Sequence, residues 1–259
     1  MKSTKGTCVL ELSIQLKSAL ICLSVIAWLA LATPARASLV QNGSFETTSL
    51  SSPGGYFCQA GASCVSNVFD WTSTCNAGGC GNGSTVLSLL FPNTNGSAFN
   101  CCGLDGTVAN SPDGGNFVGA DGDPQYSAPF SQTINGLILG HTYQLSFFQA
   151  AAQQGGTSGA TTERWQVTLG SDTQLSSLMT NPSGGFQPWT QQKMTFTAKS
   201  VNEVLMFLAI GTPAGLPPVS LLDGVALTES PEPSVMFLTL SVVPLLAFSA
   251  IRTRRKKRA

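Results

Sequence analysis

Hydrophobic and polar residues alternate along the second half of the chain, between residues 116 and 228. The alternation is clearest at 142–150, where Tyr143, Leu145 and Phe147 fall on one face. A period of two predicts a strand with one buried face. Short segments of this kind, bounded by turn residues, predict strands at 116–120, 130–134, 142–150, 164–169, 190–198, 204–210 and 219–227. No stretch here has helical periodicity, so we expect an all-β fold, an antiparallel β-sandwich.

The first 37 residues have a different pattern. A basic leading region precedes Ala19–Ala32, an uncharged apolar run, and Ala35-Arg36-Ala37 follows it. This order is typical of a secretory signal peptide, and the run is short for a membrane-spanning helix. We therefore predict cleavage after Ala37; an uncleaved N-terminal anchor is the alternative.

Residues 230–259 form a third segment. Pro231-Glu232-Pro233 is followed by an uncharged apolar run at 234–251 and a basic cluster at 252–258. Eighteen helical residues would span ~27 Å, about the thickness of a bilayer core. The basic cluster predicts a cytoplasmic C-terminus, so the body at 38–229 should lie outside the inner membrane.

Composition and charge narrow the class of partner. The whole chain has a formal net charge of zero, but the residues from Ser38 to Ser230 include three basic and eleven acidic side chains, a difference of eight. An acidic body argues against nucleic acid as a partner. Only 10% of residues are charged and glycine is abundant (27 residues), which favours turns and short strands.

The region at 47–115 is rich in glycine and contains every cysteine that would remain after signal cleavage: Cys58, Cys64, Cys75, Cys80, Cys101 and Cys102. An even number of cysteines in an exported protein predicts three disulfides. Spacing suggests Cys58–Cys64 and Cys75–Cys80, but this leaves two adjacent cysteines to form a strained ring. The connectivity therefore stays open.

The C-terminal segment resembles the PEP-CTERM sorting signal of Gram-negative bacteria. The resemblance rests on Pro231, Glu232 and Pro233, the apolar run and the basic end. It implies recognition by an exosortase, a membrane cysteine peptidase, cleavage near the motif, and transfer to the cell surface or to extracellular polysaccharide. Ser230 and Pro244 depart from the usual pattern, and an ordinary tail anchor is the alternative.

The body resembles the galactose-binding-like jelly rolls, which include many carbohydrate-binding modules. The resemblance rests on the opening segment 39–46, a Gln-Thr-Ile to Leu-Ser-Phe hairpin at 132–147, and the closing segment 221–227. It implies that the opening and closing segments lie together, and that Glu46 and Asp223 share a structural calcium ion. Alternatively, Glu46 caps backbone amides and Asp223 stabilises a turn.

Other polar and aromatic residues suit structural roles. Asp121 and Asp123 belong to an Asp-Gly-Asp-Pro sequence that lacks the continuation of a calcium loop, so we expect a turn. We expect His141 to be a solvated turn residue. Three tryptophans should fill the core, whereas the aromatic residues of turn-rich segments should be more exposed. The first group is Trp71, Trp165 and Trp189, and the second is Tyr56, Phe57 and Tyr126.

Motifs of enzymes are missing from the sequence, including Gly-x-Ser-x-Gly, His-Glu-x-x-His and phosphate loops. We therefore expect an exported, exosortase-processed protein of the cell surface or extracellular matrix, non-enzymatic, acting in adhesion or polysaccharide association. The alternatives are a secreted carbohydrate-active hydrolase on the same scaffold and a purely structural matrix protein.

Overall fold

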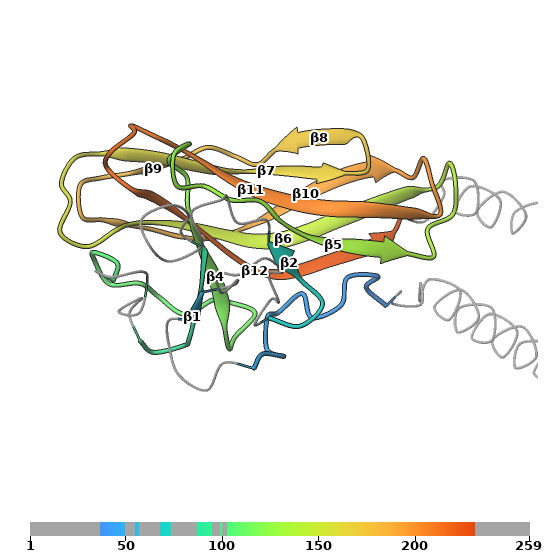
Figure 1. The fold of residues 1–259 in the computed structure, drawn as a ribbon, viewed down its shortest axis with the longest axis horizontal. Coiled ribbons are helices and arrows are strands. Elements are labelled where there is room, and N and C mark those ends of the chain that lie inside the picture. The colour runs from blue at the N-terminus through green and yellow to red at the C-terminus, as the bar shows by residue number, and fades with distance from the viewer. Residues whose placement is uncertain are drawn as a thin grey trace, which may run out of the picture. The chain divides into compact units, whose positions relative to one another are not determined.

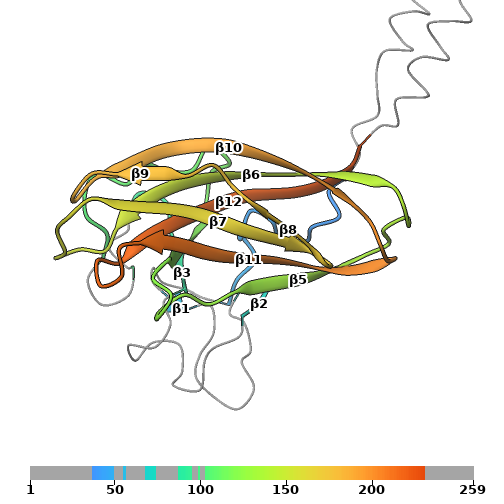
Figure 2. The same ribbon diagram turned by 90° about the horizontal axis from the view of Figure 1, so that it is seen from above.

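The computed structural model describes residues 37–49, 55–56, 68–73, 87–94, 99 and 103–230. From Ser38 onward they belong to one compact unit. They form two antiparallel sheets packed face to face, as Figures 1 and 2 show from two directions. The expected all-β sandwich is confirmed for this part of the chain. No helix among the described residues has the length and hydrophobicity to cross a membrane.

Each sheet contains four of the strands that make up the sandwich. The first sheet has the order β1 (Gly55–Tyr56), β3 (Leu87–Leu90), β4 (Phe117–Asp121), β12 (Pro218–Glu229), β6 (Thr142–Gln153) and β10 (Phe186–Thr197). The second has the order β2 (Thr72–Ser73), β5 (Phe130–Asn135), β11 (Asn202–Thr212), β7 (Thr161–Leu169) and β8 (Asp172–Leu175), and β9 (Met179–Asn181) also pairs with β7. The order β4-β12-β6-β10 facing β5-β11-β7-β8 is that of a jelly roll.

The expected strands are all present, but one expected pairing is wrong. The seven predicted segments correspond to β4, β5, β6, β7, β10, β11 and β12. However, β5 and β6 do not form the hairpin expected at 132–147, because β5 pairs with β2 and β11 whereas β6 pairs with β10 and β12. The turn at 136–141 therefore carries the chain from one sheet to the other.

The core between the sheets is dominated by aromatic residues on alternate strand positions. Phe130 stacks on Phe207 with ring centroids 5.7 Å apart, and Trp165 meets Phe207 edge-on at 6.0 Å. Phe147 contacts Phe207 from the opposite sheet at 5.4 Å. Such pairs stabilise beyond the area that they bury.

A second apolar cluster lies on the outer face of the first sheet. Phe117, Val219 and Leu221 are buried there against Phe99 and Leu104 from the connections between strands. The first sheet is thus covered on both faces at its centre. This explains why residues 218–223 of β12 are all buried and do not alternate.

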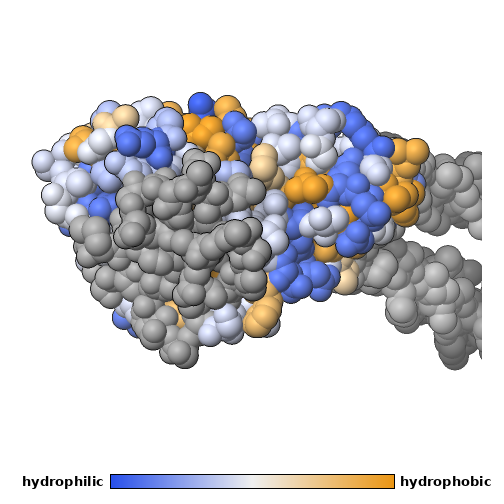
Figure 3. Space-filling view, viewed as in Figure 1, coloured by the Kyte–Doolittle hydropathy of each residue, from blue (hydrophilic) through white to orange (hydrophobic). Residues whose placement is uncertain are grey.

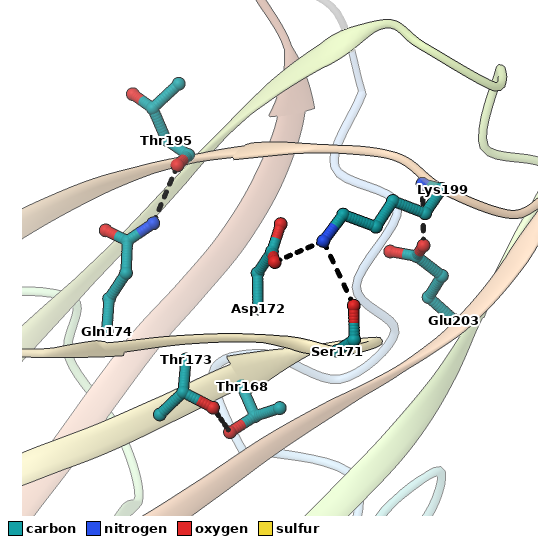
Figure 4. A network of polar contacts seen from close by, with 8 residues as sticks. All are labelled: Thr168, Ser171, Asp172, Thr173, Gln174, Thr195, Lys199 and Glu203. Atoms are coloured by element: carbon teal, nitrogen blue, oxygen red, sulfur yellow. Dashed lines mark hydrogen bonds and ion pairs between the residues drawn. The ribbon is translucent and has the colours of Figure 1, made fainter.

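One end of the sandwich is closed by a polar network around the β7–β8 hairpin (Figure 4). Lys199 forms an ion pair with Asp172 and donates to the Ser171 hydroxyl at 3.1 Å, while its backbone amide donates to Glu203 Oε1 at 2.7 Å. The Gln174 amide donates to the carbonyl of Thr195 at 2.7 Å. Because β8 and β10 belong to different sheets, this last bond links the two layers.

Several predicted features lie outside the described residues. They are the signal peptide up to residue 36, the six cysteines and their disulfides, the Pro231-Glu232-Pro233 motif, and the apolar and basic segments at 234–258. These stay predictions from the sequence.

Candidate functional site

The opening segment of the body lies against β12. The amide of Leu39 donates to the carbonyl of Leu227 at 2.8 Å, and the amide of Val225 donates to the carbonyl of Gly43 at 2.9 Å. A Cβ atom added to Gly43 would stand only 1.9 Å from the Val225 oxygen. The opening and closing segments of the resemblance are therefore held together by close backbone contact.

Asp223 is a buried carboxyl group on β12, next to this contact. It lies where the register between β12 and β6 shifts, and its side chain is fully buried. Its Oδ1 accepts the amide of Gly224 at 2.7 Å, whereas its Oδ2 has no well-formed hydrogen bond among the described residues. An unpaired buried carboxylate oxygen is costly, so this atom marks a place where a further partner would be favourable.

Two further carboxylates face Asp223. Burial raises the pKa of Asp223 to about 8; the nearby Ser111 hydroxyl and Gly224 amide partly offset this, and the charges of Asp113 and Glu46 add to it. Without a cation, Asp223 is therefore mostly protonated at neutral pH. Asp113 and Glu46 are exposed, so the group opens toward solvent.

Missing side chains make room for these carboxylates. Gly115 has a φ of 68°, and a Cβ there would stand 1.8 Å from Oε1 of Glu46. The same Oε1 accepts the amide of Asn116 at 2.6 Å. Gly224 has a φ of 60°, and a Cβ there would stand 3.0 Å from the carboxyl carbon of Asp113. Both glycines are thus needed for backbone conformation and for space.

The donor set suits a hard cation such as calcium, which prefers carboxylate, carbonyl and hydroxyl oxygens. Within the described ranges, however, no three Asp, Glu, His or Cys side chains are arranged as a ready metal-ligand group. Glu46 also caps the Asn116 amide, as the alternative interpretation expects. The site thus has the right chemistry and an unpaired oxygen, but a calcium ion would have to draw Glu46 or Asp113 inward.

A separate groove of about 640 Å³ lies at the β2–β5 edge of the second sheet. Its lining residues combine an aromatic ring with amides, hydroxyls and one carboxylate; they are Gln41, Val68, Phe69, Asp70, Trp71, Thr72, Ser131, Gln132, Thr133 and Asn135. Ligand sites typically combine apolar surface with a few polar groups in this way.

Phe69 is the exposed ring of this groove, and 49% of its surface is accessible. Its backbone is held on both sides: its amide donates to the carbonyl of Thr47 at 3.0 Å, and its carbonyl accepts the Asn42 side-chain amide at 2.8 Å. Two residues on, the indole of Trp71 is buried and donates to the Asn42 carbonyl at 2.9 Å. The chain therefore presents an apolar ring to solvent from a rigid segment.

Gln132 joins the three segments that form the groove. Its amide oxygen accepts the Gln41 amide at 2.8 Å, and its amide nitrogen donates to the carbonyls of Gln41 at 2.8 Å and Asp70 at 3.0 Å. The side chain is buried, so these three bonds are shielded from water. The groove is thus preformed rather than assembled by a ligand.

The remaining predicted residues have structural positions. Asp121 accepts the amide of Asp123, which accepts those of Gln125 and Gly215, so the Asp-Gly-Asp-Pro sequence forms the expected turn. His141 departs from expectation: it lies at a turn but is only partly exposed, and its Nδ1 is 2.6 Å from Oε1 of Glu229. The carboxylate at the end of β12 is the partner that a local sequence pattern does not reveal.

The aromatic expectations are largely met. Trp71 and Trp165 are buried in the core, whereas Trp189 is half-buried against Phe117, with ring centroids 5.5 Å apart. Tyr126 is half-buried in the turn after Asp123. The side chain of Tyr56 and all of Phe57 lie outside what the structure describes.

Phe69 and Asp113 are the candidate site residues that sequence reasoning missed. No local signal identified Phe69: it lies two residues before Trp71 in a turn where Asp70 has a φ of 69°, so the alternation of a strand does not apply to it. The signal for Asp113 was its position before Gly114-Gly115, because such turns let a carboxylate approach a neighbouring strand.

No protein-family model matches the chain, and no curated protein matches it. Solved structures do. TmCBM61, solved in complex with beta-1,4-galactotriose, is 13% identical, with 74% of this chain and 99% of that chain covered and a TM-score of 0.43. The CBM22-1 xylan-binding domain from Paenibacillus barcinonensis Xyn10C is 12% identical (76% and 97% covered, TM-score 0.37). The enzymatically active domain of bacteriophage CBA120 tailspike protein 4 is 14% identical (74% and 21% covered, TM-score 0.40). These distant likenesses assign no ligand or activity to this chain.

Proposed function

We propose that this chain is an exported, non-enzymatic module that associates with extracellular polysaccharide. Delivery is by the N-terminal signal peptide and the PEP-CTERM-like tail, which an exosortase would process at the inner membrane. The observation that carries the binding proposal is the preformed groove with the exposed ring of Phe69. Sugar rings stack an apolar face on aromatic side chains while their hydroxyls bond to amides and carboxylates at the rim.

The polar residues around Phe69 supply such a rim. Asp70 is exposed beside the ring, and Thr133 and Asn135 project from the exposed face of β5. Thr72 donates its hydroxyl to the carbonyl of Ser131 at 3.2 Å, which fixes the β2–β5 edge below them. A groove along a sheet edge suits a chain-like ligand that enters and leaves at both ends.

The distribution of acid groups favours binding over hydrolysis. A glycosidase needs a carboxylic acid of raised pKa that can reach its substrate. The described carboxyls with a raised pKa are Asp121, Glu163 and Asp223, and each has at most 1% of its surface exposed. These three groups are shielded from any substrate in this fold, which supports binding rather than hydrolysis.

A structural calcium ion is part of the proposal. Asp223, Glu46 and Asp113 would hold it, and the ion would offset most of the negative charge of three carboxylates at the junction of the opening segment with β12. Its role there is stabilisation rather than chemistry, since the groove at Phe69 involves different residues.

The test is a glycan array with the full-length protein and two variants, followed by product analysis. Phe69→Ala should weaken retention about tenfold or more, since a central aromatic contact is lost. Leu178→Ala is the matched control, because Leu178 is also exposed (57%) but lies on the β8–β9 connection. New reducing ends would establish a hydrolase. Unchanged retention of the Phe69→Ala variant would exclude the groove as the binding site. No retention on any glycan would favour a purely structural protein.

A further inference from the structure

An exposed apolar tip lies at one end of the sandwich. It consists of Ile138 and Leu139 in the β5–β6 turn and Val201 in the β10–β11 turn, with 48%, 65% and 57% of their surfaces exposed. Figure 3 shows apolar surface gathered at the end where these turns lie in Figure 1. Exposed apolar residues scattered singly need no explanation, but a cluster from two separate turns does.

Backbone hydrogen bonds hold the two turns together. The amide of Leu137 donates to the carbonyl of Val201 at 3.0 Å, and that of Gly140 donates to the carbonyl of Ala198 at 2.8 Å. The amide of Ala198 in turn donates to the carbonyl of His141 at 2.9 Å. The three side chains therefore form one fixed surface.

Two charged side chains near the tip have partners. His141 meets Glu229 at 2.6 Å, and Lys199 pairs with Asp172 beside the β10–β11 turn. Charged groups in such pairs reduce the cost of bringing this end close to a medium of low dielectric constant. The tip thus presents apolar surface beside the Lys199–Asp172 ion pair and the His141–Glu229 contact.

The end of the body is fixed at the same place. β12 ends at Glu229, opposite Tyr143 at the beginning of β6, and the amide of Ser230 donates to the carbonyl of Thr142 at 2.8 Å. Thr142 follows Leu139 by three residues. The apolar run of the tail begins at Ser234, four residues after Ser230, and four residues of chain reach at most roughly 14 Å.

We propose that the tip of Ile138, Leu139 and Val201 lies on the outer surface of the bilayer while the tail is anchored. The inference rests on the proposed membrane-anchored tail, because only a tail that enters the bilayer at residue 234 brings this end of the body to the lipid. The occupant is the lipid surface itself: a leash of this length allows no intervening protein domain. The body would then be held in one orientation, with the opposite end directed away from the membrane.

The experiment places a photoreactive leucine analogue at position 139 of the full-length chain reconstituted into liposomes. Position 178 is the matched control, since Leu178 is similarly exposed but lies level with the middle of β7. After irradiation, we expect severalfold more lipid adduct at position 139 than at 178. Both substitutions are at exposed sites and should leave the fold intact.

Flotation of the liposomes separates the two hypotheses. Protein that floats, with preferential adducts at position 139, supports the contact of the tip with lipid. Protein that floats but gives equal adducts at both positions overturns the tip proposal and leaves the anchor standing. Protein that does not float shows that the tail is no membrane anchor, and the tip proposal falls with it.

Discussion

Three buried carboxyl groups make this protein sensitive to pH at the scale of single residues. Burial raises the pKa of Asp121 and Glu163 to about 7 and that of Asp223 to about 8. In the unfolded chain these groups ionise near pH 4, so between about pH 4 and 8 the folded state binds more protons. The free energy of unfolding therefore decreases as pH rises through this window.

We predict that urea unfolding in the presence of a chelator shows lower stability at pH 8 than at pH 5. Each buried carboxyl that must ionise contributes a loss of roughly 2–4 kcal/mol. Glu163→Gln should flatten part of this dependence, because neither oxygen of Glu163 has a well-formed hydrogen bond and the amide resembles the neutral acid. A free energy of unfolding that increases from pH 5 to pH 8 would contradict the placement of these groups.

Calcium should oppose this loss at one of the three positions. Binding at Asp223, Glu46 and Asp113 would keep Asp223 ionised without penalty, so added calcium should raise the melting temperature at pH 8 and have less effect at pH 5. A ligand at a hundred times its dissociation constant stabilises by about 2.7 kcal/mol. In Asp223→Asn the response should disappear. If it persists in this variant, or if chelation leaves the melting temperature of the unmodified protein unchanged, no calcium binds there.

At the scale of elements, the contact between the opening segment and β12 depends on Gly43. Any side chain there meets the Val225 oxygen at 1.9 Å, and neither backbone can move away without breaking the bond from the Val225 amide to the Gly43 carbonyl. We predict that Gly43→Ala destabilises the protein by about 2–4 kcal/mol, measured by thermal unfolding. Gly136→Ala is the control: Gly136 has open space around it and a φ of 80°, so only the ~1 kcal/mol of a left-handed backbone is lost. Equal losses of stability in the two variants would show that the opening segment and β12 can move apart at Gly43 without a large cost.

The sequence was most informative for elements with one buried face. In β6, β7 and β11 the alternation of buried and exposed positions reports directly on the sandwich. The short strand β3 has four consecutive buried residues and therefore no period to read. Strand pairing could not be predicted from the sequence either. Asn135-Gly136 favours a hairpin locally, but β5 pairs with β11 and the chain then crosses to the other sheet, where β6 begins.

The candidate sites were predictable only where the resemblance supplied a long-range contact. It related Glu46 to Asp223 across most of the chain, which no local pattern does. Asp113 and Phe69 can be recognised only when the turn before Gly115 and the turn before Trp71 are placed against other elements. Local sequence patterns predict which face of a strand a residue lies on. A binding site also depends on which strands and turns pack together, and these patterns do not predict that.

At the scale of the whole molecule, the described body makes hydrogen bonds at its first and last residues, next to the two positions where processing is predicted. The hydroxyl of Ser38 accepts the amide of Leu227 at 3.2 Å, and the amide of Ser230 donates to the carbonyl of Thr142 at 2.8 Å. Removal of residues 1–37 and of the tail after Ser230 would thus leave both bonds intact. We predict that mass spectrometry of the protein released from cells finds a chain that begins at Ser38 and ends close to Pro231-Glu232-Pro233.

The melting temperature of this trimmed form should equal that of the full-length chain within about 2 °C, because a change below 1 kcal/mol shifts a domain of this size by only a few degrees. Pro231→Ala combined with Pro233→Ala is the matched variant: it should keep the signal peptide cleavage and retain the tail. A product that keeps both extremities and folds in the cytosol would contradict export. A product cut at Ser38 whose tail is retained in cells that contain an exosortase would contradict sorting alone, and an ordinary tail anchor would then explain the apolar run.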